Sequence, residues 1–178
     1  QVLARRQNEA LQAEVLAAAR RQVQEREMFY QLFEQTPAAI ALLREPGHRI
    51  EYCNAAYEQF FPGRALRGRP LAEAVPEAVE QGFIALLNTV FQTGDTHFGS
   101  EIAYVLPASG DEPEHTRYFN FTYQAYREDG QVAGVSIFAY DVTAQVHARQ
   151  QTAALQAQVL ANSQRQVQER ATLYQVFE

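Results

Sequence analysis

The stretch RYFNFTYQAY, residues 117–126, decides the fold class because its side chains alternate in polarity. One face of this stretch is apolar and the opposite face is mixed, with Phe119, Phe121, Tyr123 and Ala125 on the first and Tyr118, Asn120, Thr122 and Gln124 on the second. Such alternation is typical of a strand in an antiparallel sheet that buries one face. The stretch therefore predicts a half-buried strand.

Two more strands are predicted around it. Phe98–Leu106 precedes it across the polar loop Pro107–Glu114, and Val132–Asp141 follows it through the turn Asp129-Gly130. Further upstream, the apolar runs Ala39–Leu43 and Arg49–Cys53 flank the turn residues Glu45-Pro46-Gly47, which predicts a hairpin.

Helices are predicted between these two groups of strands. Asn54 suits the N-cap of a short helix over Ala55–Phe61, and Leu71–Ala74 suits another helical turn. Glu77–Gln92 carries apolar residues at helical spacing and is followed by Gly94 as its stop. The order predicts an α+β domain, in which a five-stranded antiparallel sheet has its helices gathered on one side.

The two ends of the chain carry the same sequence. At an offset of 144, residues 1–34 and 145–178 are identical at 22 of 34 positions, including the run Arg21–Arg26 against Arg165–Arg170. A repeat at a fixed period indicates a tandem architecture. We therefore expect one period of a longer array, with a linker helix at each end.

Both linkers have the composition of long helices. Val2–Gln35 lacks Gly and Pro and ends before Pro37. Apolar residues recur about every seven positions, which predicts an imperfect coiled-coil seam through Val2, Leu16, Val23 and Tyr30 and through Val146, Ala153, Leu160, Val167 and Tyr174. A parallel homodimer through these helices is the favoured interpretation, and a helix folded back on its own domain is the alternative.

Composition excludes several functions. The chain has 178 residues, 47% of them hydrophobic, and a net charge of -6, so a nucleic-acid surface is not expected. All 15 basic residues are Arg, which excludes lysine Schiff-base and P-loop chemistry. A single cysteine, Cys53, excludes an internal disulfide and a multi-cysteine metal site. No signal peptide or stretch of about 20 apolar residues appears, so we expect a cytoplasmic protein without membrane contact in this segment.

Five motifs in order resemble the PAS family over Pro37–Thr143. They are residues 52–57 (YCNAAY), 66–71 (LRGRPL), 90–94 (VFQTG), 129–135 (DGQVAGV) and 141–143 (DVT). Val75-Pro76-Glu77 and Tyr118-Phe119-Asn120-Phe121 are most similar to the subgroup common in multi-PAS bacterial sensor histidine kinases.

The resemblance implies three domains in sequence: a linker helix over residues 1–36, a PAS domain over 37–143 and a second linker helix over 144–178. It also implies that Asp141, Val142 and Thr143 form the junction where sheet distortion becomes helix movement. Independently, Asp and Thr at this position supply capping oxygens for the next helix. The two interpretations overlap.

The resemblance also implies a pocket between the sheet and the central helices. We expect it to be lined by Ile40, Leu42, Tyr57, Phe60, Phe83, Leu86, Val90, Tyr104, Phe121, Tyr123 and Ile137. The pocket could hold a small organic ligand, or its aromatic side chains could fill it as core. Haem-binding relatives carry a histidine on the central helix and flavin photosensors a helical cysteine. This sequence has neither, so no cofactor and no metal are predicted.

No nucleophile, acid and base converge in the sequence, so the chain is not expected to be an enzyme. We expect a sensory and relay module of a bacterial signalling protein, whose partners are neighbouring PAS repeats and a C-terminal output domain such as a histidine kinase. A ligand-free spacer that holds the dimer together, or a regulatory module of a cyclic-di-nucleotide enzyme, is the alternative.

Overall fold

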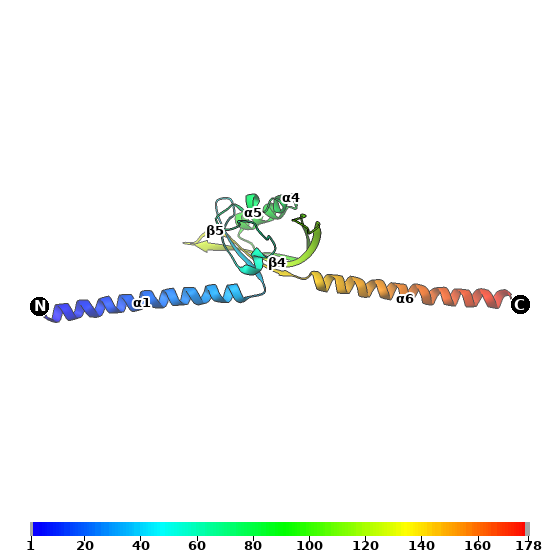
Figure 1. Cartoon of the computed structure of the whole chain (residues 1–178), viewed down its shortest axis with the longest axis horizontal. Helices are drawn as coiled ribbons and strands as arrows, with labels where there is room; N and C mark the ends of the chain where they lie inside the picture. Colours follow the sequence, from blue (N-terminus) through cyan, green and yellow to red (C-terminus); the bar gives the residue numbers. More distant parts are fainter. Residues whose placement is uncertain (1, 177–178) are drawn as a thin grey trace. The chain divides into compact units, whose positions relative to one another are not determined.

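The computed structural model describes residues 2–176, with side chains described for residues 10–172. Two long helices enclose the domain in sequence (Figure 1): α1 spans Val2–Gln35 and α6 spans Thr143–Val176. The bounds of α1 match the predicted helix, because Pro37 follows it closely. Among the described residues, no helix combines the length and the apolar character needed to cross a bilayer.

Five strands form one antiparallel sheet in the order β2-β1-β5-β4-β3. Their bounds are Ala39–Arg44 (β1), Arg49–Cys53 (β2), His97–Leu106 (β3), His115–Glu128 (β4) and Gln131–Asp141 (β5). Each predicted strand is confirmed to within two residues at either end. The predicted PAS-type α+β fold, with one long helix before the sheet and one after it in the sequence, is therefore confirmed.

Strand β1 lies between β2 and β5 in the sheet and pairs antiparallel with both. Its partners in β5 run from Ala39 opposite Ala139 to Arg44 opposite Gly134. Gly134 permits the close approach of the two strands, because a Cβ there would lie 1.9 Å from the carbonyl oxygen of Leu43. The strand that follows α1 is thus hydrogen-bonded to the strand that precedes α6.

Four short helices follow β2: α2 (Ala55–Glu58), α3 (Leu71–Ala74), α4 (Glu77–Glu80) and α5 (Phe83–Thr93). The prediction of one helix over Glu77–Gln92 is wrong, because Gly82 adopts a left-handed backbone with φ of 83° and separates α4 from α5. Helix α2 is shorter than the predicted Ala55–Phe61. The predicted stop at Gly94 is confirmed.

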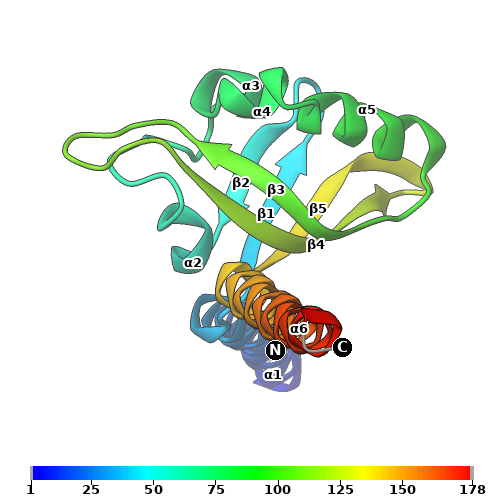
Figure 2. The same ribbon diagram turned by 90° about the vertical axis from the view of Figure 1, so that its right-hand side faces the viewer.

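Two compact units make up the chain: residues 2–97 with 122–139, and 98–121 with 140–176. In the first unit, α3, α4 and α5 lie over one face of β1 and β2, and α1 lies on the opposite side (Figure 2). The second unit contains β3, the first half of β4 and α6. Each unit therefore holds one long helix together with the strands that meet it.

Candidate functional site at the entry and exit junctions

The buried side chain of Asn54 joins three elements in the first unit. Its Oδ1 accepts hydrogen bonds from the backbone N–H groups of Ile40 (2.9 Å) and Tyr57 (3.0 Å). Its Nδ2 donates to the carbonyl oxygens of Phe33 and Ala38, both at 2.8 Å. The predicted N-cap of α2 is confirmed, and the same amide also holds the last turn of α1 and the start of β1.

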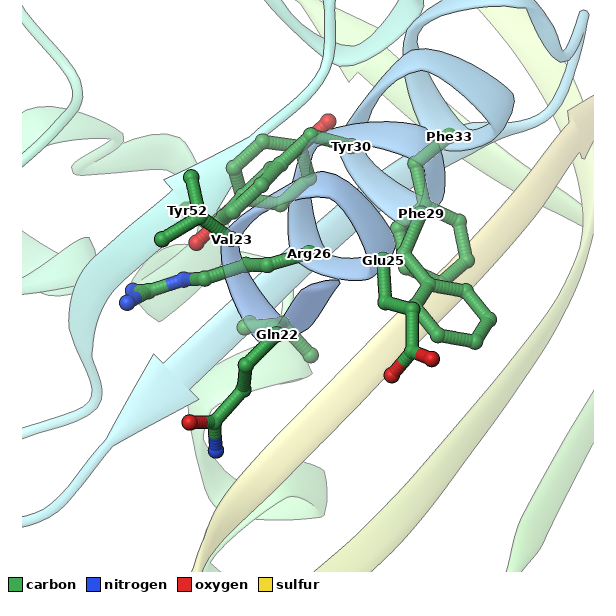
Figure 3. A pocket seen from close by; sticks show the side chains of 9 residues that line it. Gln22, Val23, Glu25, Arg26, Phe29, Tyr30, Phe33 and Tyr52 are labelled. Carbon is green, nitrogen blue, oxygen red and sulfur yellow. The ribbon is translucent and has the colours of Figure 1, made fainter. Parts of the chain in front are cut away.

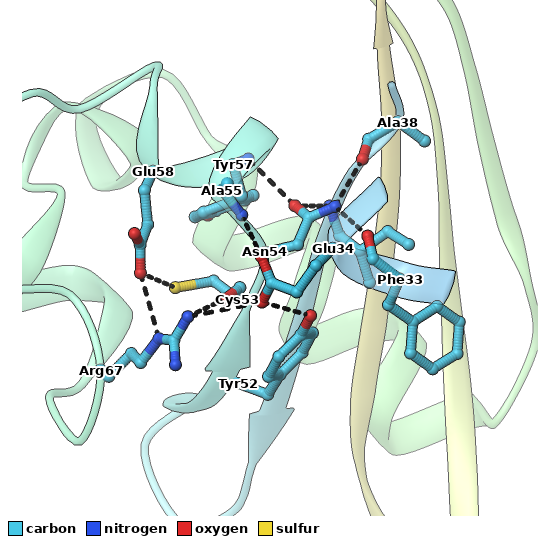
Figure 4. A network of polar contacts seen from close by, with 11 residues as sticks. Phe33, Glu34, Ala38, Tyr52, Cys53, Asn54, Ala55, Tyr57, Glu58 and Arg67 are labelled. Atoms are coloured by element: carbon cyan, nitrogen blue, oxygen red, sulfur yellow. Dashed lines mark hydrogen bonds and ion pairs between the residues drawn. The ribbon is translucent and has the colours of Figure 1, made fainter. Parts of the chain in front are cut away.

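Glu34, in the last turn of α1, contacts the domain through both carboxylate oxygens (Figure 4). Its Oε1 accepts a hydrogen bond from the Tyr52 hydroxyl at 2.8 Å, and its Oε2 accepts one from the Ala55 amide at 3.0 Å. Burial, followed by the hydrogen bond to Glu34, raises the pKa of Tyr52 above its usual range. We call Glu34, Tyr52, Asn54 and their partners the entry junction.

Cys53 lies beside this network and is fully buried. Its thiol is 3.5 Å from the Glu58 carboxylate, and its carbonyl accepts a hydrogen bond from the Arg67 guanidinium at 2.6 Å. Burial raises the pKa of the thiol, which disfavours the reactive thiolate. Cys53 therefore lies in the environment of a small buried structural residue.

A groove of about 650 Å³ runs between the second half of α1 and the β1–β2 hairpin (Figure 3). Seven α1 residues line it together with Leu42 and Tyr52: Gln22, Val23, Glu25, Arg26, Phe29, Tyr30 and Phe33. The Tyr30 and Tyr52 rings have centroids 5.4 Å apart, and the Arg26 guanidinium lies 5.8 Å from the Tyr30 ring centre. The groove is therefore largely aromatic and apolar.

Two of the residues predicted to line a ligand pocket, Ile40 and Leu42, lie on the other face of the sheet from predicted lining residues on α5. Leu42 pairs with Tyr52 and Ile40 pairs with Phe138, and these four pack together on the side of the sheet that faces α1. Helix α5, which carries the predicted lining residues Phe83, Leu86 and Val90, covers the opposite face. Ile40 and Leu42 are therefore corrections to the predicted set. Successive residues of a strand point to opposite faces of the sheet, and these two lie on the face toward α1.

The other predicted pocket residues lie in or beside the core. Tyr57, Val90, Phe121, Tyr123 and Ile137 are buried, and Phe60, Phe83, Leu86 and Tyr104 are half-buried. A pocket among them stays a prediction.

The exit junction is built from the end of β5 and the start of α6. The Thr143 hydroxyl accepts a hydrogen bond from the Tyr118 amide at 2.9 Å, and the Val142 amide donates to the Tyr118 carbonyl at 2.8 Å. The Asp141 carboxylate accepts from the Thr143 amide at 2.9 Å and contacts the Arg117 guanidinium at 3.3 Å. Asp141 thus takes the predicted capping role, whereas the Thr143 hydroxyl bonds to β4.

A second contact ties α6 to β3. The Arg149 guanidinium binds both carboxylate oxygens of Glu101, at 2.6 and 2.5 Å, and this pairing lowers the pKa of Glu101. Two residues earlier on the helix, the His147 ring meets the Tyr118 ring edge-on, with 6.0 Å between the ring centroids. The Glu101 amide donates to the Asn120 side chain at 2.7 Å. These contacts orient the first two turns of α6.

Glu34, Glu101 and Arg149 are junction residues that no sequence pattern predicted. The repeat offered a signal for Glu34, because the same residue type recurs as Glu178 after the matching Tyr and Phe. The pair formed by Glu101 and Arg149 gave no signal, since its members are 48 positions apart in sequence and belong to different elements.

The predicted coiled-coil seam divides into three groups. Leu16, Val23, Tyr30, Ala153, Leu160 and Val167 are exposed on their helices. Val146 is a correction, because it is buried within the chain and so unavailable to a partner helix. The side chains of Val2 and Tyr174 lie outside the described residues.

Known structures resemble this chain. A sensory-box sensor histidine kinase from Vibrio cholerae matches at 22% identity with a TM-score of 0.47, covering 70% of this chain and 95% of that one. The PAS domain of the histidine kinase ThkA matches at 28% identity with a TM-score of 0.44, covering 58% and 98%. The Vibrio cholerae VqmA–ligand–DNA complex matches at 23% identity with a TM-score of 0.50, covering 64% and 50%.

The family model described as the PAS fold matches residues 33–147, which include both Glu34 of the entry junction and Thr143 of the exit junction. That match covers more than half of the chain and agrees with the five-stranded sheet and its short helices. The chain therefore belongs to the PAS family.

Proposed function

We propose that this chain is a sensory and relay module of a bacterial signalling protein, which acts as a parallel homodimer and passes conformational changes between its flanking helices. The observation that carries the proposal is the pair of built junctions. Each long helix is fixed to its own strands by buried or bidentate side-chain contacts, through Asn54 and Glu34 at one end and through Thr143 and Arg149 at the other. Contacts of this kind transmit a displacement, whereas a flexible linker absorbs it.

The repeated helix sequence supports stacking of such modules. Identical residues at 22 of 34 positions mean that the exit helix of one module resembles the entry helix of another. Neighbouring PAS repeats and a C-terminal output domain are accordingly the proposed partners in the protein. A histidine kinase is the favoured output, a cyclic-di-nucleotide enzyme is the alternative, and the module itself is proposed to be non-catalytic.

Insertions in α6 test the relay. Adding one residue after Gln158 rotates the rest of the helix by about 100°, whereas adding seven nearly restores the original face. We expect the single insertion to abolish regulation of the output activity and the seven-residue insertion to retain most of it. Equal effects of both insertions on output would contradict a relay through paired helices.

A second candidate function is a spacer that dimerises without binding a ligand. It is favoured by the burial of six of the eleven predicted pocket residues, which is the arrangement of a filled core. Ligand binding to the native state raises apparent stability. A sensor is therefore expected to show co-purified small molecules or a thermal shift on addition of metabolites, whereas a spacer shows neither.

A further inference from the structure

Strand β3 changes its inward-facing side part-way along its length. Gly99 is buried, and a Cβ on it would overlap the ring of Phe121. Five residues later, the Tyr104 ring meets the Phe119 ring edge-on, with 6.3 Å between the ring centroids. Phe119 and Phe121 are both buried and lie two residues apart on β4, so they share one face. Gly99 and Tyr104 therefore face the same side, although an odd separation places two residues of a regular strand on opposite sides.

The change of side occurs at Glu101. Its backbone φ of 51° lies in the left-handed region, which residues with a Cβ rarely adopt. One extra residue in one strand of an antiparallel pair is a β-bulge. Two side chains hold this bulge: Asn120 Oδ1 accepts a hydrogen bond from the Glu101 amide at 2.7 Å, and Arg149 binds both carboxylate oxygens. The bulge is therefore supported in part by α6.

The sequence of β3 favours a strand without the bulge. The even-numbered residues from 98 to 106 are Phe, Ser, Ile, Tyr and Leu, four of which are apolar or aromatic, whereas the odd-numbered ones from 97 to 105 are His, Gly, Glu, Ala and Val. A straight strand would turn Phe98 inward together with Tyr104 and Leu106. In the bulged strand Phe98 is 73% exposed, although burial of a phenylalanine side chain is favourable. The pattern and the observed register therefore disagree in the first half of β3.

Opposing contributions balance the two registers. The bulged register has the strain of a left-handed Glu101 and an exposed Phe98, but it keeps the contacts from Asn120 and Arg149. The straight register relieves the strain and places Ser100 against Phe121. Its displaced residue moves into the connection formed by residues 94–96, where one more residue costs little.

We infer that β3 is a two-register switch, in which the Arg149 contact selects the bulged register and its loss lets residues 98–100 slip by one position, turning Phe98 inward. Both registers belong to the domain and its exit helix, so the switch operates whether the chain relays a signal or is a spacer. A one-residue slip exchanges the faces of a strand, so the two states are discrete. Docking of α6 is thereby converted into the exposure of an aromatic side chain on an edge strand of the sheet (Figure 2).

A single tryptophan tests the slip in the intact chain. The chain contains no tryptophan, so Phe98→Trp introduces the only one. We expect Arg149→Gln to lower the acrylamide quenching constant of this tryptophan by about two-fold or more, because an indole that leaves solvent is shielded from the quencher. Arg165→Gln replaces an exposed arginine farther along α6 and is the matched control, which should leave the quenching unchanged.

Deletion of Glu101 provides a reference with one register. The deletion removes the extra residue, so both halves of β3 keep their present inward-facing residues in a regular strand. The tryptophan introduced at position 98 should then stay exposed, and adding Arg149→Gln should not change its quenching. An equal response to Arg149→Gln with and without the deletion would show that the tryptophan reports something other than the slip.

The backbone of Glu101 gives a second measurement in chains that retain Phe98. Its 13Cα and 13Cβ chemical shifts distinguish a left-handed from an extended residue. We expect them to move to extended values in Arg149→Gln and also in Asn120→Ala, which removes the other contact to the bulge. A Glu101 that stays left-handed in both variants, with unchanged quenching, would overturn the switch and make the bulge a fixed feature of β3. Unfolding of the sheet in both variants would also overturn it, because the switch requires a stable straight register.

Discussion

At the scale of single residues, the side chain of Asn54 connects α1, the start of β1 and α2. Its carboxamide uses all four of its hydrogen-bonding positions on backbone groups, in a site without solvent access. A buried polar group that loses its partner costs free energy because water cannot replace the bond. The stability of the entry junction should therefore depend on this one side chain.

We predict that Asn54→Ala lowers the free energy of unfolding by about 3 kcal/mol, since it removes the side-chain hydrogen-bond partner of four backbone groups at this buried position. Asn54→Asp separates the two roles of the side chain: it keeps both acceptor positions for Ile40 and Tyr57 and loses both donors to Phe33 and Ala38. It should destabilise mainly the last turn of α1. Urea unfolding monitored by circular dichroism measures both effects, with the exposed Gln59→Ala as control. A loss below about 1 kcal/mol for Asn54→Ala would contradict this account.

At the scale of elements, alternation and turn residues were sufficient to predict the strands. The alternation over residues 117–126 predicted β4, because the two faces of that strand differ in polarity. In β1, by contrast, the run Ala39–Leu43 is apolar throughout, so no pattern distinguishes its two faces. The predicted pocket therefore included Ile40 and Leu42 from the wrong face. The junction contacts of Glu101 with Arg149 depend on tertiary placement, which no local pattern contains.

The break between α4 and α5 depends on the backbone of Gly82. Its φ of 83° is unfavourable for residues with a Cβ, although Asn tolerates this region better than most. We predict that Gly82→Ala destabilises the domain by about 1–2 kcal/mol and that Gly82→Asn costs clearly less. Nothing lies within 4 Å of a Cβ at this position, so steric crowding does not contribute. Equal losses for both variants in thermal unfolding would argue against backbone strain as the cause.

Acid should weaken the docking of α6 onto β3. The hydrogen bonds from Arg149 lower the pKa of Glu101 from its ordinary value of 4.5. A carboxylate with a lowered pKa stabilises the folded state above that ordinary value, and the contribution is lost as the pH falls through the lowered one. We therefore predict faster hydrogen exchange in the first turns of α6 as the pH is lowered from 6 to about 3, after correction for the intrinsic rate.

Glu101→Gln should remove that pH dependence, because the amide stays neutral throughout the range. Glu114→Gln, an exposed loop substitution, is the matched control and should behave as wild type. An unchanged acid response in Glu101→Gln would show that another group is responsible.

At the scale of the whole molecule, the relay and the spacer differ in one measurable property. A relay requires that a change at one junction alters the other, and such coupling is reciprocal when it is expressed as free energy. A spacer holds both helices but requires no coupling between them. Hydrogen exchange measured along the chain therefore distinguishes the two functions without knowledge of the signal.

We predict that Glu101→Gln increases hydrogen exchange at the start of α6 and also changes it in the last turn of α1, around residues 33–38. Glu34→Gln, which places an amide donor opposite the Tyr52 hydroxyl or the Ala55 N–H, should change exchange at residues 143–150 in return. Responses confined to the substituted junction in both variants would leave the domain a spacer, with any signal passing between helices by another route.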